Sequence, residues 1–138
     1  MSTRQLLHEW VAELAEVLGV PPPSITDNGF VSLQCEKDLL VHIGAFDAND
    51  VLHFFCTLRS APTDEQAMRQ AMRMALQLNV DLAGKIQGAI GLSPDEMEFV
   101  LSAHFPVAGL DGEMFAQRLI VFMNTCLLTK EQFDHACP

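Results

Sequence analysis

The sequence predicts an α+β fold with one antiparallel sheet, in the element order α-β-β-β-α-β-β-α, within a single domain of residues 1–138. Two observations carry this prediction. Apolar residues recur at the helical period near residues 2–18, 63–78 and 111–128, whereas five other segments alternate apolar and polar residues with a period of two. Short polar turns separate neighbouring alternating segments, which favours antiparallel pairing.

The first helix is predicted to begin after Ser2, whose capping-box partner is Gln5, and to end at Leu18, before Gly19. Its core stripe consists of Leu7, Val11, Leu14 and Leu18. A second apolar row beside it, which we call the shoulder, consists of Leu6, Trp10 and Val17. Two interpretations of the shoulder stay open. Either Trp10 packs at the edge of the core, or the shoulder contacts a partner protein.

Three strands are expected to form a meander, at Phe30–Glu36, Leu39–Phe46 and Val51–Leu58. Each has one apolar face, and the inward residues are Val31, Leu33, Cys35, Leu39, Val41, Ile43, Ala45, Leu52, Phe54, Cys56 and Leu58. The opposite face is not fully polar, because it carries Phe30, Leu40, Phe46, Val51 and Phe55. That face is therefore either covered by the rest of the chain or offered to a partner.

The second helix is predicted to begin after Thr63, with Gln66 completing a capping box, and to end near Leu78. Its apolar residues span an arc of about 200°, which is more than one sheet can cover. A second subunit is one explanation, and a central helix wrapped by its own chain is the other. The expected dimer seam consists of Met68, Met72 and Ala75 on this helix, with Ile86 and Ile90 on the strand that follows.

A hairpin and a final helix complete the predicted fold. The hairpin pairs a strand at Lys85–Leu92 with one at Met97–Phe105 through a type I turn at residues 93–96. The last helix is capped by Asp111 and runs to about Leu128. A separate short turn is expected to begin at Thr129.

Composition excludes several classes of partner. The net charge is −10 with only eight basic residues, so the chain lacks the clustered cations that nucleic acids require. No apolar run approaches the roughly 18 residues of a transmembrane helix, and the start of the chain lacks the order of a signal peptide. Four cysteines without a CxxC pair fit free thiols in a reducing compartment. We therefore expect a cytoplasmic protein that binds neither nucleic acid nor membrane.

The sequence shows no recognisable catalytic or metal-binding motif, whether phosphate-binding loop, dinucleotide fingerprint, GxSxG or HExxH. His42 and His53 could face each other across two strands, but no further ligand accompanies them. No nucleophile stands beside a base. The sequence thus predicts a protein with no enzymatic activity, no cofactor and no metal. A small-molecule enzyme would require a polar cleft around the two histidines.

The second half of the sequence resembles the class I type III secretion chaperones, the Tir chaperone family. The resemblance covers a helix that ends in the step Asn79-Val80, a small-residue strand at Gly88–Leu92 and a turn at Pro94-Asp95-Glu96. It continues with the step Phe105-Pro106-Val107 and a last helix after Asp111. The element order, the small size and the low pI of about 4.7 also match this family.

The resemblance implies a cytoplasmic homodimer that binds the N-terminal segments of secreted effectors and keeps them extended, soluble and competent for export. An alternative is a regulatory anti-activator or adaptor of the same fold, which binds another chaperone or a transcription regulator. The free edge of the meander could accept an extended peptide as an added strand. From the apolar stripes, we expect partner contacts at Leu6, Trp10, Val17, Phe30, Leu40, Phe46, Val51 and Phe55.

Overall fold

The computed structural model describes residues 2–19, 21–34, 38–46 and 48–137, and it has the predicted element order. The elements are α1 (Thr3–Leu18), β1 (Phe30–Gln34), β2 (Leu40–Phe46), β3 (Val51–Ser60), α2 (Glu65–Lys85), β4 (Gly88–Leu92), β5 (Glu98–Pro106) and α3 (Gly112–Ala136). The strands form one antiparallel sheet in the order β1-β2-β3-β5-β4. The predicted fold class is therefore confirmed for a single copy of the chain.

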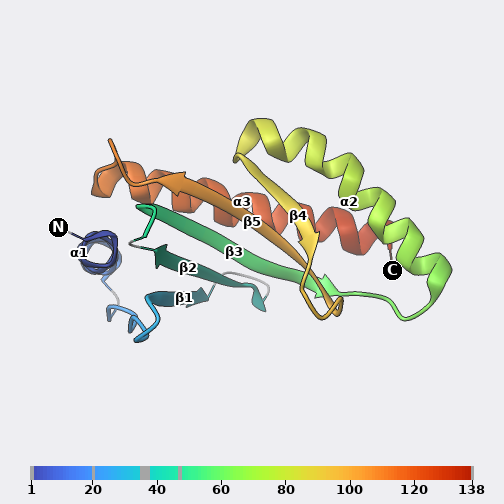
Figure 1. The fold of residues 1–138 in the computed structure, drawn as a ribbon, viewed down its shortest axis with the longest axis horizontal. Coiled ribbons are helices and arrows are strands. Elements are labelled where there is room, and N and C mark those ends of the chain that lie inside the picture. Colours follow the sequence, from blue (N-terminus) through green and yellow to red (C-terminus); the bar gives the residue numbers. More distant parts are fainter. Residues whose placement is uncertain (1, 20, 35–37, 47, 138) are drawn as a thin grey trace.

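The helices are arranged around the sheet so that one face stays without a helix. α3 runs behind the sheet along its length, α1 lies at one end, and α2 lies beside β4 (Figure 1). α1 packs on β2 and α3, while α3 also packs on β3 and α2. The core between these helices and the sheet is aromatic, with fully buried Phe54, Phe99, Phe115, Phe122 and Phe133.

Local sequence signals explain α1 and the inward faces of the strands. Ser2 Oγ accepts a hydrogen bond from the Gln5 N–H, and Gln5 Oε1 accepts one from the Ser2 N–H, which is the predicted capping box. Gly19 ends the helix with a left-handed φ of 69°. Burial alternates along β2 and β3 as expected. The inward position predicted for Cys35, the strand end at Glu36 and the turn residues Lys37 and Asp47 lie outside the described residues.

The second helix is longer than its sequence indicates, and it begins one residue later. Asp64, not Thr63, is the N-cap, because its carboxylate accepts a hydrogen bond from the Ala67 N–H at 2.9 Å. The helix continues past Leu78 to Lys85, so the strand predicted from Lys85 begins only at Gly88. Residues 79–85 include Asn, Asp and Gly, which favour helix weakly. Burial of Leu82, only 4% exposed, and docking of Asn79 on β4 override this local preference.

Asn79 hydrogen-bonds to the backbone at one edge of the sheet. Its side-chain oxygen accepts a hydrogen bond from the Ile90 N–H at 2.7 Å, and its side-chain nitrogen donates one to the Ile90 carbonyl at 3.2 Å. An antiparallel neighbour would pair with β4 in the same way, so one amide side chain substitutes for a strand at this point. α2 thereby covers the β4 edge, which could otherwise pair with another chain.

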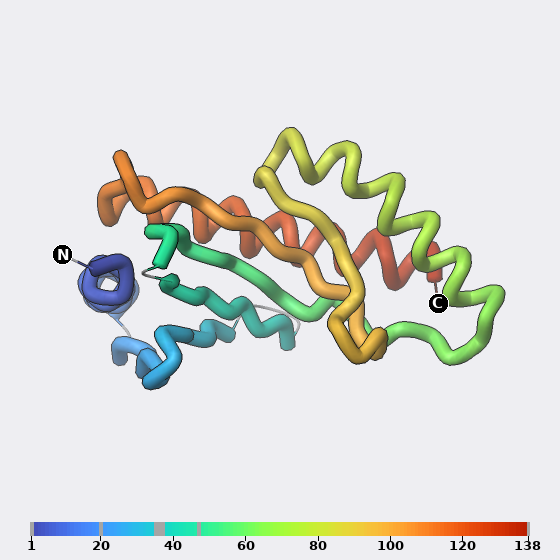
Figure 2. The backbone as a smooth tube through the Cα atoms, viewed as in Figure 1, coloured from blue at the N-terminus to red at the C-terminus, as the bar shows by residue number. Residues whose placement is uncertain are grey.

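The predicted hairpin of β4 and β5 is confirmed. Figure 2 follows the chain from α2 back along β4 and then along β5, and the register pairs Gly88 with Ala103. In the turn, the Glu96 N–H donates to the Ser93 carbonyl at 2.8 Å. Hydrogen bonds from the Ser93 hydroxyl and the Met97 N–H hold the pKa of Asp95 below its usual value. The acidic turn is thus a hydrogen-bonded hairpin tip.

The last helix is continuous to Ala136, so the separate turn expected from Thr129 is wrong. Thr129 is 3% exposed and lies on the buried side of the helix. One turn further, the ring of Phe133 packs on Phe99 with centroids 5.2 Å apart. The apolar stripe of α3 thus continues past the point where the polar residues 129–132 suggested a stop.

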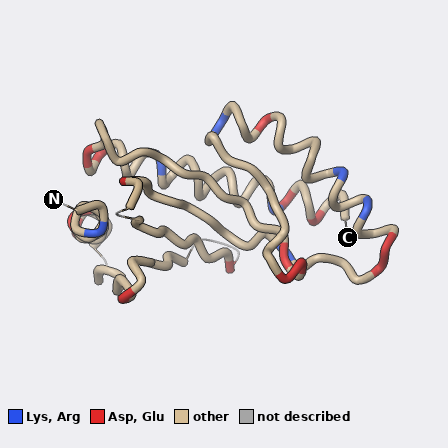
Figure 3. Tube along the Cα trace, in the orientation of Figure 1, with Lys and Arg blue, Asp and Glu red and all other residues tan. Residues whose placement is uncertain are grey.

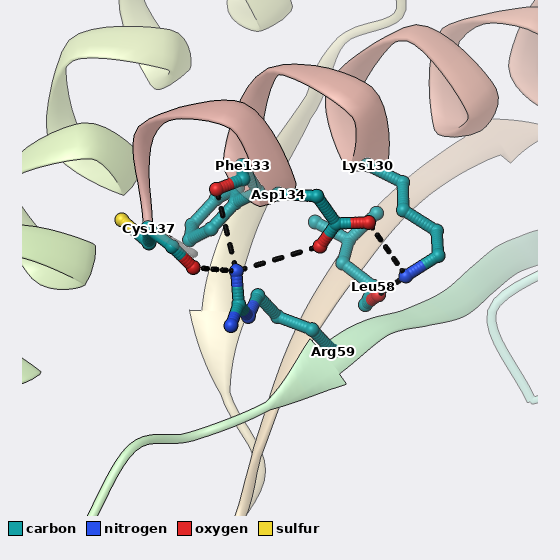
Figure 4. Close-up of polar contacts among 6 residues, drawn as sticks. All are labelled: Leu58, Arg59, Lys130, Phe133, Asp134 and Cys137. Atoms are coloured by element: carbon teal, nitrogen blue, oxygen red, sulfur yellow. Dashed lines mark hydrogen bonds and ion pairs between the residues drawn. The ribbon is translucent and has the colours of Figure 1, made fainter.

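A polar clamp holds the end of α3 against β3 (Figure 4). The guanidinium of Arg59 donates hydrogen bonds to the carbonyls of Phe133 and Cys137 and pairs with the Asp134 carboxylate. The ammonium of Lys130 reaches the Leu58 carbonyl and Asp134, at 3.1 Å each. Cations at a helix C-terminus satisfy its last carbonyls and oppose its dipole. The clamp therefore stabilises the final turns of α3 in their packed position.

We expect Asn79→Ala to lower the free energy of unfolding by about 1–3 kcal/mol, because the Ile90 N–H and carbonyl would lose their partners at a part-buried edge. Urea denaturation followed by circular dichroism measures this change. Gln77→Ala, on the exposed face of the same helix, serves as the control and should be nearly neutral. Equal midpoints for the two variants would contradict the role given to Asn79.

Candidate protein-binding surfaces

The β1 edge of the sheet has no neighbouring strand within the described part of the chain. The Phe30 N–H donates to Thr26 Oγ1 at 3.1 Å and the Phe30 carbonyl accepts from the Thr26 N–H at 2.8 Å, so the backbone groups of Phe30 point away from β2. Backbone direction alternates along an antiparallel strand, so Ser32 and Gln34 point the same way. Among the described residues, no strand lies beyond β1. An extended peptide could therefore pair there.

An apolar groove adjoins this edge. A cavity of about 340 Å³ lies between α1, β1 and α3, and its lining residues are Val11, Leu14, Ala15, Leu18, Pro23, Leu33, Gln34, Leu119, Ile120 and Met123. Leu18 and Ile120 are 64% and 54% exposed, so apolar surface reaches the solvent at the rim. Because Gln34 belongs both to the groove and to the free edge, one extended segment could use both features.

The outward sheet face carries the aromatic cluster predicted from the strand pattern. We define the aromatic face as Phe30, Leu40, Phe46, Val51 and Phe55. The ring of Phe30 meets those of Phe46 and Phe55 edge-on, at centroid distances of 5.6 and 5.9 Å. Leu40 and Phe46 are exposed and the other three are half-buried, although no helix of the described chain covers this face. Their role as partner contacts remains a prediction.

The shoulder of α1 divides into core and surface. Trp10 is only 5% exposed, and its ring stacks on Phe115 of α3 with centroids 5.5 Å apart. This position confirms the interpretation that Trp10 packs at the core and corrects its place among the partner contacts, because the large indole joins α1 to α3. Leu6 is half-buried, whereas Val17 is 83% exposed and stays available.

The residues expected at the dimer seam also divide. Ala75, Ile86 and Ile90 are buried within the single chain, which corrects their assignment to a subunit interface. Ala75 lies on the buried side of α2, Ile86 is its C-cap, and Ile90 is in β4, on which α2 packs. Met68 is half-buried and Met72 is 44% exposed.

An exposed apolar stripe lies on the other side of α2. Met72, Leu76 and Val80 are 44%, 69% and 80% exposed, and each is four residues from the next. Residues at this spacing lie on one face of a helix. Of these three, only Met72 belongs to the predicted seam; Leu76 lies within the predicted helix but outside the seam, and Val80 falls beyond the predicted helix end. We call these three residues the α2 stripe.

The histidines of the sheet do not pair as predicted. His53 stands opposite His104 of β5, and His42 stands opposite Phe55, so the expected contact between His42 and His53 is wrong. The two strands are offset by two residues relative to the expected register. His42 Nδ1 and Ser32 Oγ form a hydrogen bond of 2.7 Å. Within the described part of the chain, no three potential ligands gather to hold a metal ion.

The cross-strand histidine pair has an electrostatic consequence. The rings of His53 and His104 stack with centroids 5.6 Å apart. Burial lowers the pKa of His53 below its usual value, and repulsion by a charged His104 lowers it further. The lowered pKa therefore favours the neutral form of His53.

Comparison with known proteins identifies the fold. The model of the Tir chaperone protein (CesT) family matches residues 9–126. A chain of the ExsC–ExsE complex aligns with a TM-score of 0.77 at 16% identity, covering 95% of this chain and 96% of its own. No curated protein sequence matches the chain. No helix among the described residues is long and apolar enough to cross a membrane.

Two further solved structures share the fold. A chain of the HopA1–SchA chaperone–effector complex gives a TM-score of 0.70 at 12% identity, covering 93% of this chain and 95% of its own. A chain of the complex between the Yersinia pestis type III secretion chaperone SycH and a fragment of YscM2 gives 0.62 at 16% identity, covering 88% and 98%. At these identities the likeness establishes the fold alone.

The stability of the protein should fall as pH drops from 7.5 to 5.5, and part of this loss should depend on His53. The pKa of His53 is lower in the folded chain than the ordinary 6.5, so the unfolded chain binds the proton more tightly. As the pH falls through 6.5, protonation therefore favours the unfolded state. Urea midpoints at several pH values measure this change. His53→Gln should flatten the profile, while His8→Gln on the exposed side of α1 should not. Identical slopes for both variants would refute the assignment.

Proposed function

Because the chain belongs to the Tir chaperone protein (CesT) family, we propose that it is a type III secretion chaperone that binds the N-terminal segment of one or more secreted effectors. It keeps this client segment extended, soluble and competent for export. A structural neighbour, SchA with HopA1, is described as a chaperone–effector complex, and another is the chaperone SycH bound to a protein fragment. Both are consistent with a surface that receives an extended polypeptide.

The single observation that carries this proposal is the continuity of the free β1 edge with the apolar groove. An added strand would pair with the backbone of Ser32 and Gln34 and place alternate side chains against Leu33 and Ile120. Fixing each client residue costs roughly 1–2 kcal/mol in backbone entropy. Burying one Leu-sized anchor returns roughly 1.5–3 kcal/mol. Several anchors along an extended segment are therefore needed.

Further client contacts are proposed on the aromatic face and at Leu6 and Val17 of α1. Phe46 and Leu40 expose apolar surface without the covering helix that the inner sheet face has. Such a surface is unfavourable in water unless a partner covers it. With the β1 edge, the groove and the aromatic face, a single chain would bind an extended client segment. This binding requires no chemical reaction of the client.

The chain is proposed to work as a cytoplasmic homodimer of one domain, without enzymatic activity or cofactor. The α2 stripe replaces the buried residues of the predicted seam, because Met72, Leu76 and Val80 can reach a second copy. A twofold axis would bring the same stripe from both copies together. Methionine and leucine side chains adapt readily to such a helix–helix contact.

Co-expression with candidate secreted proteins tests the client proposal. We expect one such protein to become soluble and to co-purify, whereas Ile120→Glu should abolish the complex by placing a charge in the groove. Leu128→Glu, on the same helix but outside the groove and 62% exposed, is the matched control. Capture of only a transcription regulator or another chaperone would favour the anti-activator instead.

Blocking the edge gives a second test of the same complex. Ser32→Pro removes an outward N–H and should lower client affinity at least several-fold, while the β1–β2 pairing survives because that N–H does not face β2. Titration of the client by calorimetry measures this effect. Ser32→Ala keeps the N–H and should bind normally. A normal affinity of the Pro variant would exclude strand addition at β1.

Leu76→Glu should convert the proposed dimer into monomers, because it places two like charges near the twofold axis. Light scattering after size exclusion should give twice the chain mass of 15.2 kDa for the wild type and the single mass for the variant. Val17→Glu on α1, where the side chain is 83% exposed against 69% for Leu76, is the control and should remain dimeric. A monomeric wild type at micromolar concentration would rule out the seam.

A further inference from the structure

A second cleft lies on the other side of α3 from the apolar groove. It has a volume of about 340 Å³ and lies between the α2–β4 connection, the end of β5 and the first half of α3. Its lining residues are Gly84, Lys85, Ile86, Gln87, Phe105, Met114, Gln117, Arg118 and Val121. The groove is lined by Ile120 and this cleft by Val121, so these two adjacent residues of α3 separate the two sites.

The cleft is unusual in charge for this chain. It contains Lys85 and Arg118, which are two of only eight basic residues in a chain of net charge −10. Figure 3 shows how sparse the Lys and Arg positions are among the more numerous acidic ones. The Lys85 ammonium is 3.9 Å from Asp81, and both side chains are largely exposed, so this local pair is weak. Lys85 therefore remains able to meet another carboxylate.

The floor of the cleft is apolar and holds Arg118 in place. The guanidinium carbon of Arg118 lies 4.7 Å from the centroid of the Phe105 ring, a cation–π contact that orients the side chain. Met114 and Val121 remain 38% and 49% exposed beside it. A ligand could thus cover apolar surface and meet a cation at the same time.

The α2–β4 connection at the rim has a strained backbone. Gln87 has a φ of 53°, in the left-handed region that residues other than Gly, Asn and Asp seldom adopt. Such strain often occurs where a backbone serves binding. Here it turns the chain within two residues of the α2 end, which places both Lys85 and Gln87 on the cleft.

We propose that this cleft binds an extended peptide segment that carries a carboxylate next to an apolar side chain. The apolar side chain would cover Phe105, Met114 and Val121, and the carboxylate would lie between Lys85 and Arg118. Two cations in a cleft suit a single Asp or Glu side chain, whereas the rest of this acidic chain repels one.

The source of the segment is taken to be the secreted client, and this part rests on the proposed function. A client strand on β1 that leaves the groove at Ile120 needs only to cross α3 at Val121 to enter the cleft. The cleft would then select clients with an acidic residue at a fixed distance after the segment that pairs with β1.

Titration with two synthetic peptides tests the cleft on the whole protein. The probes are acetyl-Ser-Leu-Asp-Leu-Ser-amide and the same peptide with Asn in place of Asp. Binding is followed through the backbone amide chemical shifts of the protein. The Asp peptide should shift the signals of residues 84–87 and 117–121 and bind about three- to tenfold more tightly at low salt. At about 0.5 M salt the two peptides should bind alike, since salt screens exposed charges.

Arg118→Met and Lys85→Met should each reduce the preference for the Asp peptide, and Met at 118 can still cover Phe105. Arg73→Met removes an equal charge from the exposed side of α2, outside the cleft, and should leave the preference unchanged. Equal binding of both peptides, shifts confined to other residues, or the same loss in Arg73→Met would overturn the proposal.

The same variants separate this proposal from the proposed function. If a client binds wild type and Arg118→Met equally, and the peptides are not distinguished, the cleft proposal fails while the chaperone function stands. If the Asp peptide is preferred at the cleft although no secreted client is found, the cleft chemistry is supported and the proposed function fails.

Discussion

The two edges of the sheet differ in what lies beside them, because α2 packs on β4 whereas no strand of the described residues lies beyond β1. Every edge strand carries N–H and carbonyl groups that need a partner. At β4 the side chain of Asn79 supplies both bonds to Ile90, and α2 is held beside the strand as a result. At β1 the chain returns only as far as Thr26, so Ser32 and Gln34 keep their outward groups. The asymmetry leaves one edge of the sheet beside a helix and the other edge without a neighbouring strand among the described residues.

The position of α2 follows from the same contact. Because Asn79 and Leu82 fasten its second half to the sheet, Ala71, Ala75 and Leu82 are buried. Met72, Leu76 and Val80 then lie about a third of a turn around the helix from these residues, where the side chains are exposed. One helix thus shows both a core face and an external apolar face. The broad apolar arc of the α2 sequence reflects these two faces. For this reason, neither a helix buried entirely by its own chain nor a helix used entirely between subunits accounts for the whole arc.

Much of this fold was predictable because its signals are local. The inward residues of β2 and β3, the caps of α1 and α3, and the hairpin all follow from period and turn chemistry. What failed depends on contacts distant in sequence. Trp10 is buried by Phe115, and the end of α3 is extended by its packing on Phe99 and by Arg59. The free edge was expected in general terms, but the pairing of Thr26 with Phe30, which leaves Ser32 and Gln34 outward, had no clear sequence signal.

The open β1 edge also bears on self-association. A strand with unpaired backbone can recruit an identical strand from a neighbouring copy, which is a route to fibrils and precipitates. β1 has five residues, and Thr26 already occupies the backbone of Phe30, so a second copy would find few bonds. The short length of β1 and the polar side chains of Ser32 and Gln34 thus disfavour pairing between the β1 strands of two copies. A polypeptide with apolar anchors gains binding free energy from the neighbouring groove, which an identical copy of β1 cannot. The edge can therefore stay open without promoting aggregation of the protein itself.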